Sequence, residues 1–145
     1  MAEAPEEKLV LKPGGVSHFL SGLRQTEDCE SFFFGTLNLN NRRVEGLAKT
    51  MDEVKEVRHC DLGLNNIVDV TPLKDMQQLI YLQLTKNKIK AFNVFCTEDA
   101  FPNLKWLDVS HNKLVELPAI KCAKLEYLDI SYMKLEKVND GWQGH

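Results

Sequence analysis

Hydrophobic residues recur along most of the chain in a frame that is longer than one strand or one helical turn. From residue 104 the chain reads LKWLDVSHNKLVEL, with leucine or valine at positions 1, 4, 6, 11 and 14 of the frame and asparagine at position 9. The centre of the frame alternates apolar and polar residues, as a half-buried β-strand does. The frame therefore predicts a short strand followed by a turn.

The same frame occurs five times. It fits LIYLQLTKNKIKAF from residue 79 and VRHCDLGLNNIVDV from residue 57, where Cys60 replaces a leucine. It also fits LEYLDISYMKLEKV from residue 125, where Met133 replaces the asparagine, and a weaker copy, FGTLNLNNRRVEGL, from residue 34 with Arg42 at that position. The copies begin at residues 34, 57, 79, 104 and 125, so the intervals are 23, 22, 25 and 21 residues. This spacing predicts a repeat array.

Repeats of this length and composition are typical of leucine-rich repeats. A single copy cannot bury its own leucines, so neighbouring copies stack and their strands join into a parallel sheet. We therefore predict an α/β solenoid of five leucine-rich repeats over residues 34–138, with short parallel strands on the concave face and helices and loops on the convex face. Asn65, Asn87 and Asn112 are expected to be buried where the chain leaves the sheet and to bond backbone groups there.

The second half of each repeat differs between copies. Thr71-Pro72-Leu73 indicates the start of a helix, with Thr71 as its cap. Helical spacing of apolar residues on the convex side is found in two repeats, at Leu73, Met76 and Leu79 and at Met51, Val54 and Val57. The 25-residue repeat predicts a longer helix or loop that bulges around Phe95 and Phe101, and the 21-residue repeat predicts an extended or tightly turned return.

Both ends of a solenoid need a cap. Residues 16–33 are predicted to form an N-terminal helical cap, with a capping helix over 16–25, because Val16, Phe19, Leu20 and Leu23 share one helical face. Residues 1–15 are expected to be a mobile segment. Residues 139–145 are a C-terminal tail or the start of a missing repeat. Either Trp142 folds back over the last repeat, or the chain is a fragment of a longer repeat protein, which we favour.

Strand residues that point away from the core form columns across the concave face. The first column is Thr36, His59, Tyr81, Trp106 and Tyr127, and the second is Asn38, Asp61, Gln83, Asp108 and Asp129. The third is Asn40, Gly63, Thr85, Ser110 and Ser131, and the fourth, at the strand exit, is Asn41, Leu64, Lys86, His111 and Tyr132. Three aromatic residues in one column thus stand beside three aspartates in the next.

Aromatic side chains often dominate the energy of protein interfaces, and aspartates attract arginine or lysine. We expect a protein partner with basic and apolar contact groups to bind eight residues of the first two columns: His59, Asp61, Tyr81, Gln83, Trp106, Asp108, Tyr127 and Asp129. Two alternatives remain. The rings could merely shield their neighbours while the aspartates keep the face soluble, or partners could use the convex bulge around Phe95 and Phe101.

Composition narrows the function further. The chain has 145 residues, which is the size of one domain, and its net charge of -3 argues against direct contact with nucleic acid. No apolar run approaches the length of a membrane span, and the N-terminus resembles neither a secretory signal nor a transit peptide. Four widely spaced cysteines, without a CxxC pair, predict free thiols in a reducing, cytoplasmic compartment: Cys29, Cys60, Cys96 and Cys122.

The concave face is not expected to be catalytic. His59 and His111 lie in different columns two repeats apart, on the order of 10 Å, which is too wide for one small metal ion. No nucleophile is predicted beside them, because Cys60 should point into the core. Gly14-Gly15 lacks the strand and helix that surround a phosphate-binding loop. We therefore expect no enzyme activity and no cofactor.

The repeat NNIVDVTPL over residues 65–73 resembles the intracellular 22-residue class of leucine-rich repeats, which includes phosphatase regulatory subunits, a spliceosomal protein and a dynein light chain. Residues 11–90, with Leu11, Val16, LSGL from residue 20 and VRHCDLGLNNIVDVTPLKDMQQLIYLQL, are similar to the leucine-rich repeat protein of ciliary radial spokes. This resemblance implies a structural subunit of a ciliary or flagellar axonemal complex. A regulatory subunit that binds a phosphatase or another enzyme, and a ribonucleoprotein scaffold, are the alternatives.

Overall fold

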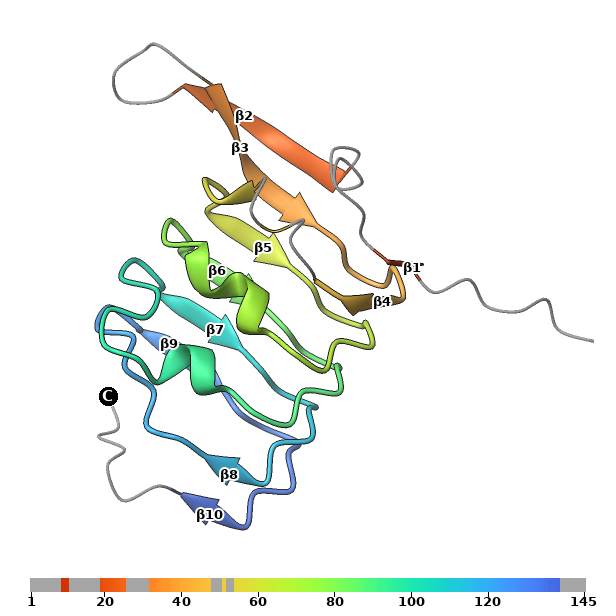
Figure 1. The fold of residues 1–145 in the computed structure, drawn as a ribbon, viewed down its shortest axis with the longest axis vertical. Coiled ribbons are helices and arrows are strands. Elements are labelled where there is room, and N and C mark those ends of the chain that lie inside the picture. The colour runs from red at the N-terminus through yellow and green to blue at the C-terminus, as the bar shows by residue number, and fades with distance from the viewer. Residues whose placement is uncertain (1–8, 11–18, 26–31, 48–50, 52–53, 139–145) are drawn as a thin grey trace, which may run out of the picture.

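The computed structural model describes residues 9–10, 19–25, 32–47, 51 and 54–138. Its main feature is a six-stranded sheet in which the strands follow one another along the molecule (Figure 1). The strands, in their order in the sheet, are β2 (Leu20–Gln25), β3 (Phe32–Asn38), β5 (His59–Asp61), β6 (Tyr81–Gln83), β7 (Trp106–Asp108) and β9 (Tyr127–Asp129). From β3 to β9 every pair is parallel, which confirms the predicted solenoid sheet.

The register of the sheet follows the repeat frame. Thr36 pairs with His59, His59 with Tyr81, Tyr81 with Trp106 and Trp106 with Tyr127. The core-facing row runs beside it through Leu37, Cys60, Leu82, Leu107 and Leu128. A one-residue slip would turn every side chain to the opposite face of a strand, so this register confirms the predicted columns.

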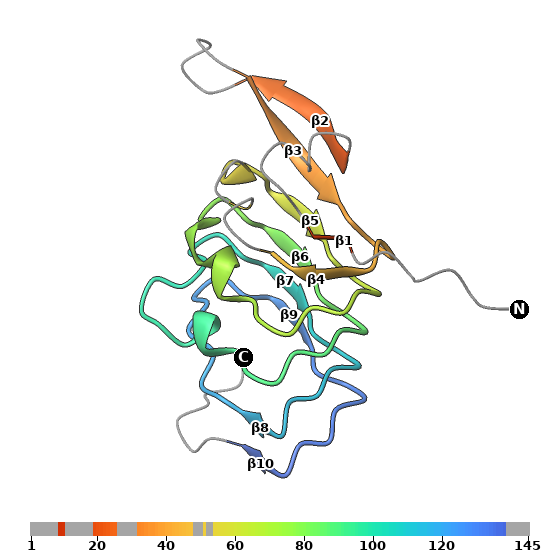
Figure 2. The same cartoon turned by 45° about the vertical axis from the view of Figure 1, so that its right-hand side comes forward.

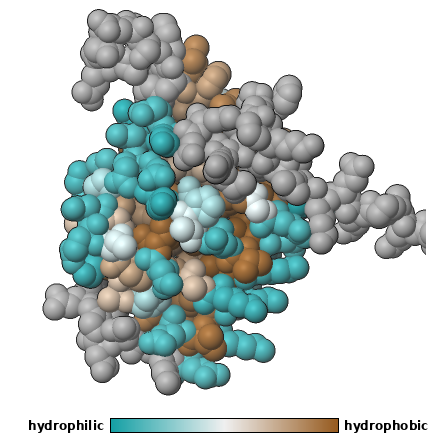
Figure 3. Space-filling view, in the orientation of Figure 1, coloured by the Kyte–Doolittle hydropathy of each residue, from teal (hydrophilic) through white to brown (hydrophobic). Residues whose placement is uncertain are grey.

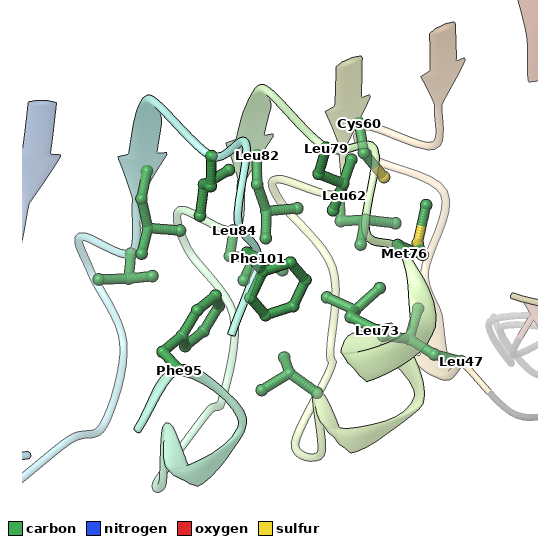
Figure 4. Close-up of a cluster of buried hydrophobic side chains, with 14 of the residues drawn as sticks. Leu47, Cys60, Leu62, Leu73, Met76, Leu79, Leu82, Leu84, Phe95 and Phe101 are labelled. Carbon is green, nitrogen blue, oxygen red and sulfur yellow. The ribbon is translucent and has the colours of Figure 1, made fainter. Parts of the chain in front are cut away.

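The interior of the solenoid is a continuous row of apolar side chains. Leu82 and Leu84 point into it from β6 and the residue after it, and Cys60 and Leu62 occupy the same places in the preceding repeat (Figure 4). All four are fully buried. Met76 and other residues of the opposite side close the interior, as the helical spacing predicts (Figure 4).

The side opposite the sheet is built from 3-10 helices and short strands. Two 3-10 helices, η3 (Thr71–Asp75) and η4 (Asn93–Phe95), cover the interior of two repeats (Figure 1). The prediction that Thr71 caps a helix was wrong: Thr71 is already inside η3, and its N–H donates to Asp69 Oδ1 at 2.9 Å. The described residues contain no α-helix on this side.

The shorter strands lie away from the main sheet. β1 (Leu9–Val10) pairs in parallel with β4 (Val44–Gly46), so part of the segment predicted to be mobile forms a strand. β8 (Glu116–Leu117) pairs with β10 (Lys137–Val138), side by side at one end of the molecule (Figure 2). The 21-residue repeat therefore returns in an extended conformation, as predicted. The remaining residues of 1–15, and all of 139–145 with Trp142, lie outside the described residues.

The 25-residue repeat holds its extra chain around an aromatic cluster. Phe95 packs on Phe92 with ring centroids 5.8 Å apart and on Phe101 at 5.0 Å. All three rings are buried, and Figure 4 shows Phe95 and Phe101 facing the leucines of the sheet. The rings of Phe95 and Phe101 therefore belong to the core and offer no exposed contact themselves, while binding to the convex side of this repeat stays an alternative.

The N-terminal cap is a strand instead of the predicted helix. β2 pairs antiparallel with β3, and Leu20 lies opposite Leu37 while Leu23 lies opposite Phe34. Gly22 has a φ of +68°, a conformation that no residue of a right-handed helix adopts. Pairing with β2 also satisfies the backbone edge of β3, which a helix would leave open. Residues 16–18 and 26–31 lie outside the described residues.

Three asparagines tie neighbouring repeats together, as predicted. Asn87 donates through Nδ2 to Leu84 O in its own repeat and to Leu62 O in the preceding one, both at 3.0 Å. Its Oδ1 accepts from Ile67 N at 3.0 Å. Asn65 and Asn112 make the equivalent bonds one repeat before and one repeat after. Each buried amide therefore satisfies backbone groups that the turn leaves unpaired.

Candidate functional site: the aromatic column of the concave face

The structure brings together the eight residues predicted to bind a partner. His59, Tyr81, Trp106 and Tyr127 form the first column of the sheet, and the second column follows two residues later on each strand. Tyr127 is the most exposed of the three rings from Tyr81 onward, with 45% of its surface accessible, while Tyr81 and Trp106 are half-buried. We call Tyr81, Trp106 and Tyr127 the aromatic column.

The three rings of the aromatic column are stacked. The centroids of Tyr81 and Trp106 are 4.2 Å apart with an interplanar angle of 11°, and those of Trp106 and Tyr127 are 5.0 Å apart at 4°. His59 extends the stack at 6.2 Å, tilted by 30°. Because the sheet holds the strands at a fixed spacing, side chains in register stack without further adjustment. The inner ring faces are therefore used within the column, and His59 lies over the outer face of Tyr81. Among the described residues, the ring edges and the outer face of Tyr127 remain uncovered by other rings.

The hydroxyl group of Tyr81 makes a hydrogen bond within its own strand. Tyr81 Oη donates to Gln83 Oε1 at 2.8 Å. Partial burial raises the pKa of the Tyr81 phenol, and the negative charges of Asp61 and Asp108 raise it further. The phenol therefore remains a neutral donor across the physiological range. Gln83, which the sequence placed on the face for contact with a partner, also positions this ring.

The aspartates of the second column have a structural role as well as a charge. Oδ1 of Asp61, Asp108 and Asp129 each accepts from the backbone N–H two residues later, at 2.9 Å. This bond fixes the turn at the strand exit. Bonds from Ser131, a contact with Tyr127 and the positive field of His111 lower the pKa of Asp129. Asp129 is therefore a carboxylate at neutral pH.

The carboxylate of Asp61 accepts side-chain hydrogen bonds in addition to the backbone bond that all three aspartates accept. Asn40 Nδ2 donates to both of its carboxylate oxygens, at 3.0 and 3.2 Å. A side chain at Gly63 would collide with these groups, since an added Cβ would lie 2.9 Å from Asn40 Nδ2 and 3.2 Å from Asp61 Oδ1. The acidic groups that can best turn toward a partner are therefore Asp108 and Asp129, in the C-terminal half of the face.

A second ring stack lies at the strand exit. His111 and Tyr132 stack with centroids 4.2 Å apart and an interplanar angle of 13°, and 76% of the Tyr132 surface is accessible. The repeat frame places both residues in the fourth column, but the predicted binding set omitted them. Both have a positive φ of 54°, as do Asn41, Leu64 and Lys86 at the same position, with values of 53–55°. This shared turn brings the two rings into contact, and a left-handed residue other than glycine could not be predicted from the frame.

Two hollows formed by described residues lie away from the aromatic column. One, of about 230 Å³, is lined by Arg58, Gln78, Ile80, Asn103, Lys105 and Lys124. Another, of about 390 Å³, lies beside Phe92 and Pro118. Neither is lined by a residue of the first two columns. These two hollows therefore do not involve the aromatic column. The described residues hold no group of three or more His, Cys, Asp or Glu side chains arranged for a metal ion.

Exposed apolar side chains also occur away from the concave face. On the face that carries η3 and η4, Figure 3 shows apolar atoms gathered in the middle with hydrophilic atoms around them. Val68 and Val115, which follow the turns, are about half exposed, at 51% and 48%. The stacked rings and neighbouring carboxylates distinguish the concave face from these scattered side chains.

Comparison with known proteins agrees with this geometry. A family model described as Leucine Rich Repeat matches residues 103–122, which hold β7 and the turn after it. This segment of the chain therefore matches a leucine-rich repeat. Lumican from Bos taurus is 34% identical over 108 residues, which is 71% of this chain and 30% of lumican. Lumican from Oryctolagus cuniculus is 33% identical over 109 residues, covering 71% of this chain and 53% of that one. The chain thus spans only part of the length of these relatives.

A solved structure has the same architecture. The leucine-rich repeat ectodomain of the receptor kinase SOBIR1 from Arabidopsis thaliana superposes with a TM-score of 0.55 at 18% identity, over 81% of this chain and 80% of that one. This likeness shows the leucine-rich repeat fold. Among the described parts of the chain, no helix has the length and apolar character that crossing a membrane requires.

Three of the four cysteines are described, and all three are free thiols. Cys60 is fully buried at a core leucine position, where burial, with a further effect of Asp61, raises its pKa far above the usual range. Burial, and next the nearby Cys96, raise the pKa of Cys122 to about 12. These two thiols are therefore protonated and unreactive at neutral pH. Cys29 lies outside the described residues.

Proposed function

We propose that this leucine-rich repeat protein is a non-catalytic scaffold that holds a protein partner on the concave face through the aromatic column. The observation that supports this most strongly is the stack of Tyr81, Trp106 and Tyr127 beside the aspartates of the second column. Rigid, preorganised aromatic side chains lose little conformational entropy on binding and contribute large contact areas.

The charge of the face defines the partner's chemistry. Asp108 and Asp129 lie two residues after Trp106 and Tyr127, so apolar and acidic groups alternate along the strands. A partner that presents arginine or lysine among apolar side chains would match both kinds of group. Nucleic acid would meet these carboxylates with its own negative charge, so the proposed partner is a protein.

Replacement of the whole aromatic column tests this function. A variant with Tyr81→Ala, Trp106→Ala and Tyr127→Ala should retain the fold, because the core row and the asparagines are untouched. It should bind the partner at least a hundredfold more weakly, since central aromatic residues often contribute about 2 kcal/mol or more each. The matched control is Val68→Ala with Val115→Ala, which shortens exposed apolar side chains away from the column. Retained partner affinity in the folded triple variant, measured by quantitative pull-down, would place the binding surface elsewhere.

The cellular setting that we propose is the axoneme of a cilium or flagellum, in the cytoplasmic compartment. It is supported by the similarity of residues 11–90 to the radial spoke protein and by the free thiols at Cys60, Cys96 and Cys122. Neither lumican nor the receptor ectodomain is a ciliary protein by name. A tagged copy in a flagellated cell should therefore be found in the detergent-resistant axonemal fraction. A wholly secreted, diffuse or nuclear protein would contradict this setting and leave the binding role of the face intact.

A further inference from the structure

We propose that Cys96 and Cys122 are a disulfide site that joins two neighbouring repeats when the protein meets a thiol oxidant such as glutathione disulfide. Both thiols are free in the structure. Cys96 directly follows η4, on the side of the solenoid opposite the main sheet (Figure 1). The inference goes beyond the proposed function and is independent of it, because the site does not involve the concave face.

Backbone hydrogen bonds define which residues of neighbouring repeats lie opposite each other. Where an N–H first donates to a carbonyl of the preceding repeat, the residues after the donor and the acceptor are paired. Val115 O accepts from Glu136 N at 2.7 Å, and the next residues, Glu116 and Lys137, lie opposite each other in β8 and β10. Each parallel step of the main sheet follows the same rule.

This rule places the two cysteines opposite each other. Phe95 O accepts from Lys121 N at 2.8 Å, so the residues that follow, Cys96 and Cys122, face each other across neighbouring repeats. Chains that are hydrogen-bonded in this way lie about 4.8 Å apart. A disulfide joins residues whose Cα atoms are roughly 4.4–6.8 Å apart. The backbone therefore already has the spacing that the bond requires.

The two thiols are also close enough for one to affect the ionisation of the other. After burial, the nearby Cys96 is the second cause of the raised pKa of Cys122, which is about 12. Cys96 Sγ donates to Phe92 O at 3.3 Å, but an S–H group is a weak donor and loses little when this bond is broken. Neither cysteine lies within a strand, so both side chains can turn toward each other.

The surroundings make Cys96 the thiol that reacts first. Cys96 is only half-buried, whereas 2% of the Cys122 surface is accessible. Burial raises the pKa of Cys96, and the positive charge of Lys121 opposes this rise. The charge that raises the pKa of Cys122 is that of Cys96, so Cys96 ionises before Cys122. The thiolate is the reactive form of a cysteine, which makes Cys96 the attacking group.

Two exchange steps form the bond. The Cys96 thiolate attacks one sulfur of glutathione disulfide, which gives a mixed disulfide and releases a glutathione thiolate. The Cys122 sulfur then attacks the Cys96 sulfur and displaces the second glutathione, which takes up the Cys122 proton. The two protein thiols are oxidised, and glutathione disulfide is reduced to two molecules of glutathione. Cys122 is closed to reagents from the solvent, but the second step needs only the sulfur that lies beside it.

The bond would fasten the extra chain of the 25-residue repeat to the repeat that follows. It closes the chain between residues 96 and 122, which contains β7, into a loop. A closed loop restricts the unfolded chain and raises its free energy relative to the folded state. Oxidation should therefore stabilise the solenoid without changing its sheet.

Peptide mapping after oxidation tests the pairing. The full, folded chain is incubated with glutathione disulfide, alkylated and digested with trypsin. A bond between Cys96 and Cys122 joins the peptide of residues 91–105 to that of residues 122–124. We expect this linked pair to be the main disulfide of the folded chain and to be lost on treatment with dithiothreitol.

The matched control is the same oxidation in denaturant. Successive cysteines are separated by similar lengths of chain, from 26 to 36 residues, so an unfolded chain has no strong preference among them. We expect a mixture of disulfides there. An equally mixed product from the folded chain, or a main bond from Cys96 to Cys29 or Cys60, would overturn the proposal.

Thermal denaturation provides a second measurement. Oxidation should raise the Tm by about 5–10 °C. Cys96→Ser and Cys122→Ala should each abolish this shift, while Cys29→Ser should retain it. A linked chain whose Tm is unchanged or lower would show that the bond distorts the fold and would also overturn the proposal.

The pH dependence of the rate follows from the attacking thiolate. Because the pKa of Cys96 is raised above its ordinary value, its thiolate fraction increases about tenfold for each unit of pH near neutrality. Bond formation should therefore be close to tenfold faster at pH 8 than at pH 7. A rate that is independent of pH over this range would exclude the Cys96 thiolate as the attacking group and contradict the mechanism.

Discussion

Adjacent residues in these repeats have opposite environments. Cys60 points into the core with no accessible surface, while Asp61, the next residue, lies on the concave face and bonds Asn40 and Gly63. The stability effect of a substitution therefore depends on its place in the frame more than on the size of the change.

Substitution of Cys60 by Asp should unfold the protein, because burial of an unpaired carboxylate costs several kcal/mol out of a typical stability of about 5–15 kcal/mol. Asp61→Ala should cost about 1–3 kcal/mol, since it leaves Asn40 Nδ2 and Gly63 N without their acceptor. Denaturant titration of both variants measures the difference. Equal midpoints would contradict the register of the sheet.

Position 86 is strained. Lys86 is exposed and has a φ of 55°, a left-handed conformation that costs most residues roughly 1–2 kcal/mol. Asparagine tolerates it better and already stands at the equivalent position 41. Lys86→Asn should therefore raise the free energy of unfolding by about 0.5–1 kcal/mol, measured by thermal denaturation. Lys88→Asn, an exposed position without a positive φ, is the control, and equal gains in both variants would show that strain at residue 86 is not the cause.

At the scale of the repeat, Asn65, Asn87 and Asn112 occupy the same frame position in successive repeats and form an asparagine ladder. The ladder stops before the last repeat. Asn65, Asn87 and Asn112 each bond backbone groups of the preceding repeat, but Met133 occupies the fourth place. An asparagine there would reach Val109 O with its Nδ2 and Leu114 N with its Oδ1, by analogy with Asn112, which bonds Leu84 O and Ile89 N.

Met133→Asn should therefore anchor the last repeat. Each added hydrogen bond contributes about 1 kcal/mol, which outweighs the loss of a side chain that is only partly buried. Hydrogen exchange is the direct measurement, and the Leu114 amide should exchange at least tenfold more slowly. Met133→Leu conserves the apolar volume and should leave that rate unchanged. Exchange at Leu114 that is equally fast in both variants would mean that the ladder does not extend to this repeat.

The elements show which parts of the fold the sequence predicts. The strands, columns and buried asparagines follow from side-chain periodicity, which the sheet enforces directly. The spacing of Phe19, Leu20 and Leu23 predicted a capping helix from the local pattern alone. These residues lie in or beside β2 instead, because pairing of β2 with β3 satisfies the backbone groups of a whole sheet edge. Helical spacing at Leu73 and Met76 correctly predicted burial but not the type of helix, since a single turn has too few residues to distinguish an α-helix from a 3-10 helix.

At the scale of the whole molecule, the candidate site forms because the stacked repeats place one aromatic side chain from each strand beside the next. The frame predicts that Tyr81, Trp106 and Tyr127 share a column, and the sheet brings their rings to within 4.2–5.0 Å. The frame could not predict that Asp61 is held by Asn40, or that His111 and Tyr132 stack, because both depend on the turn geometry after each strand. We therefore expect a partner to bind mainly the C-terminal half of the face, where the least constrained carboxylates and the most exposed rings lie.

Photo-crosslinking from a single position tests the binding role of this face most directly. A benzophenone amino acid in place of Gln83 lies between the aromatic column and the strand exit, while the same group in place of Val68 lies on exposed surface away from the column. With the protein partner bound, position 83 should crosslink to it in a reaction that excess unlabelled chain suppresses, and position 68 should not. Strong crosslinks from position 68 and none from position 83 would contradict the concave face as the binding surface.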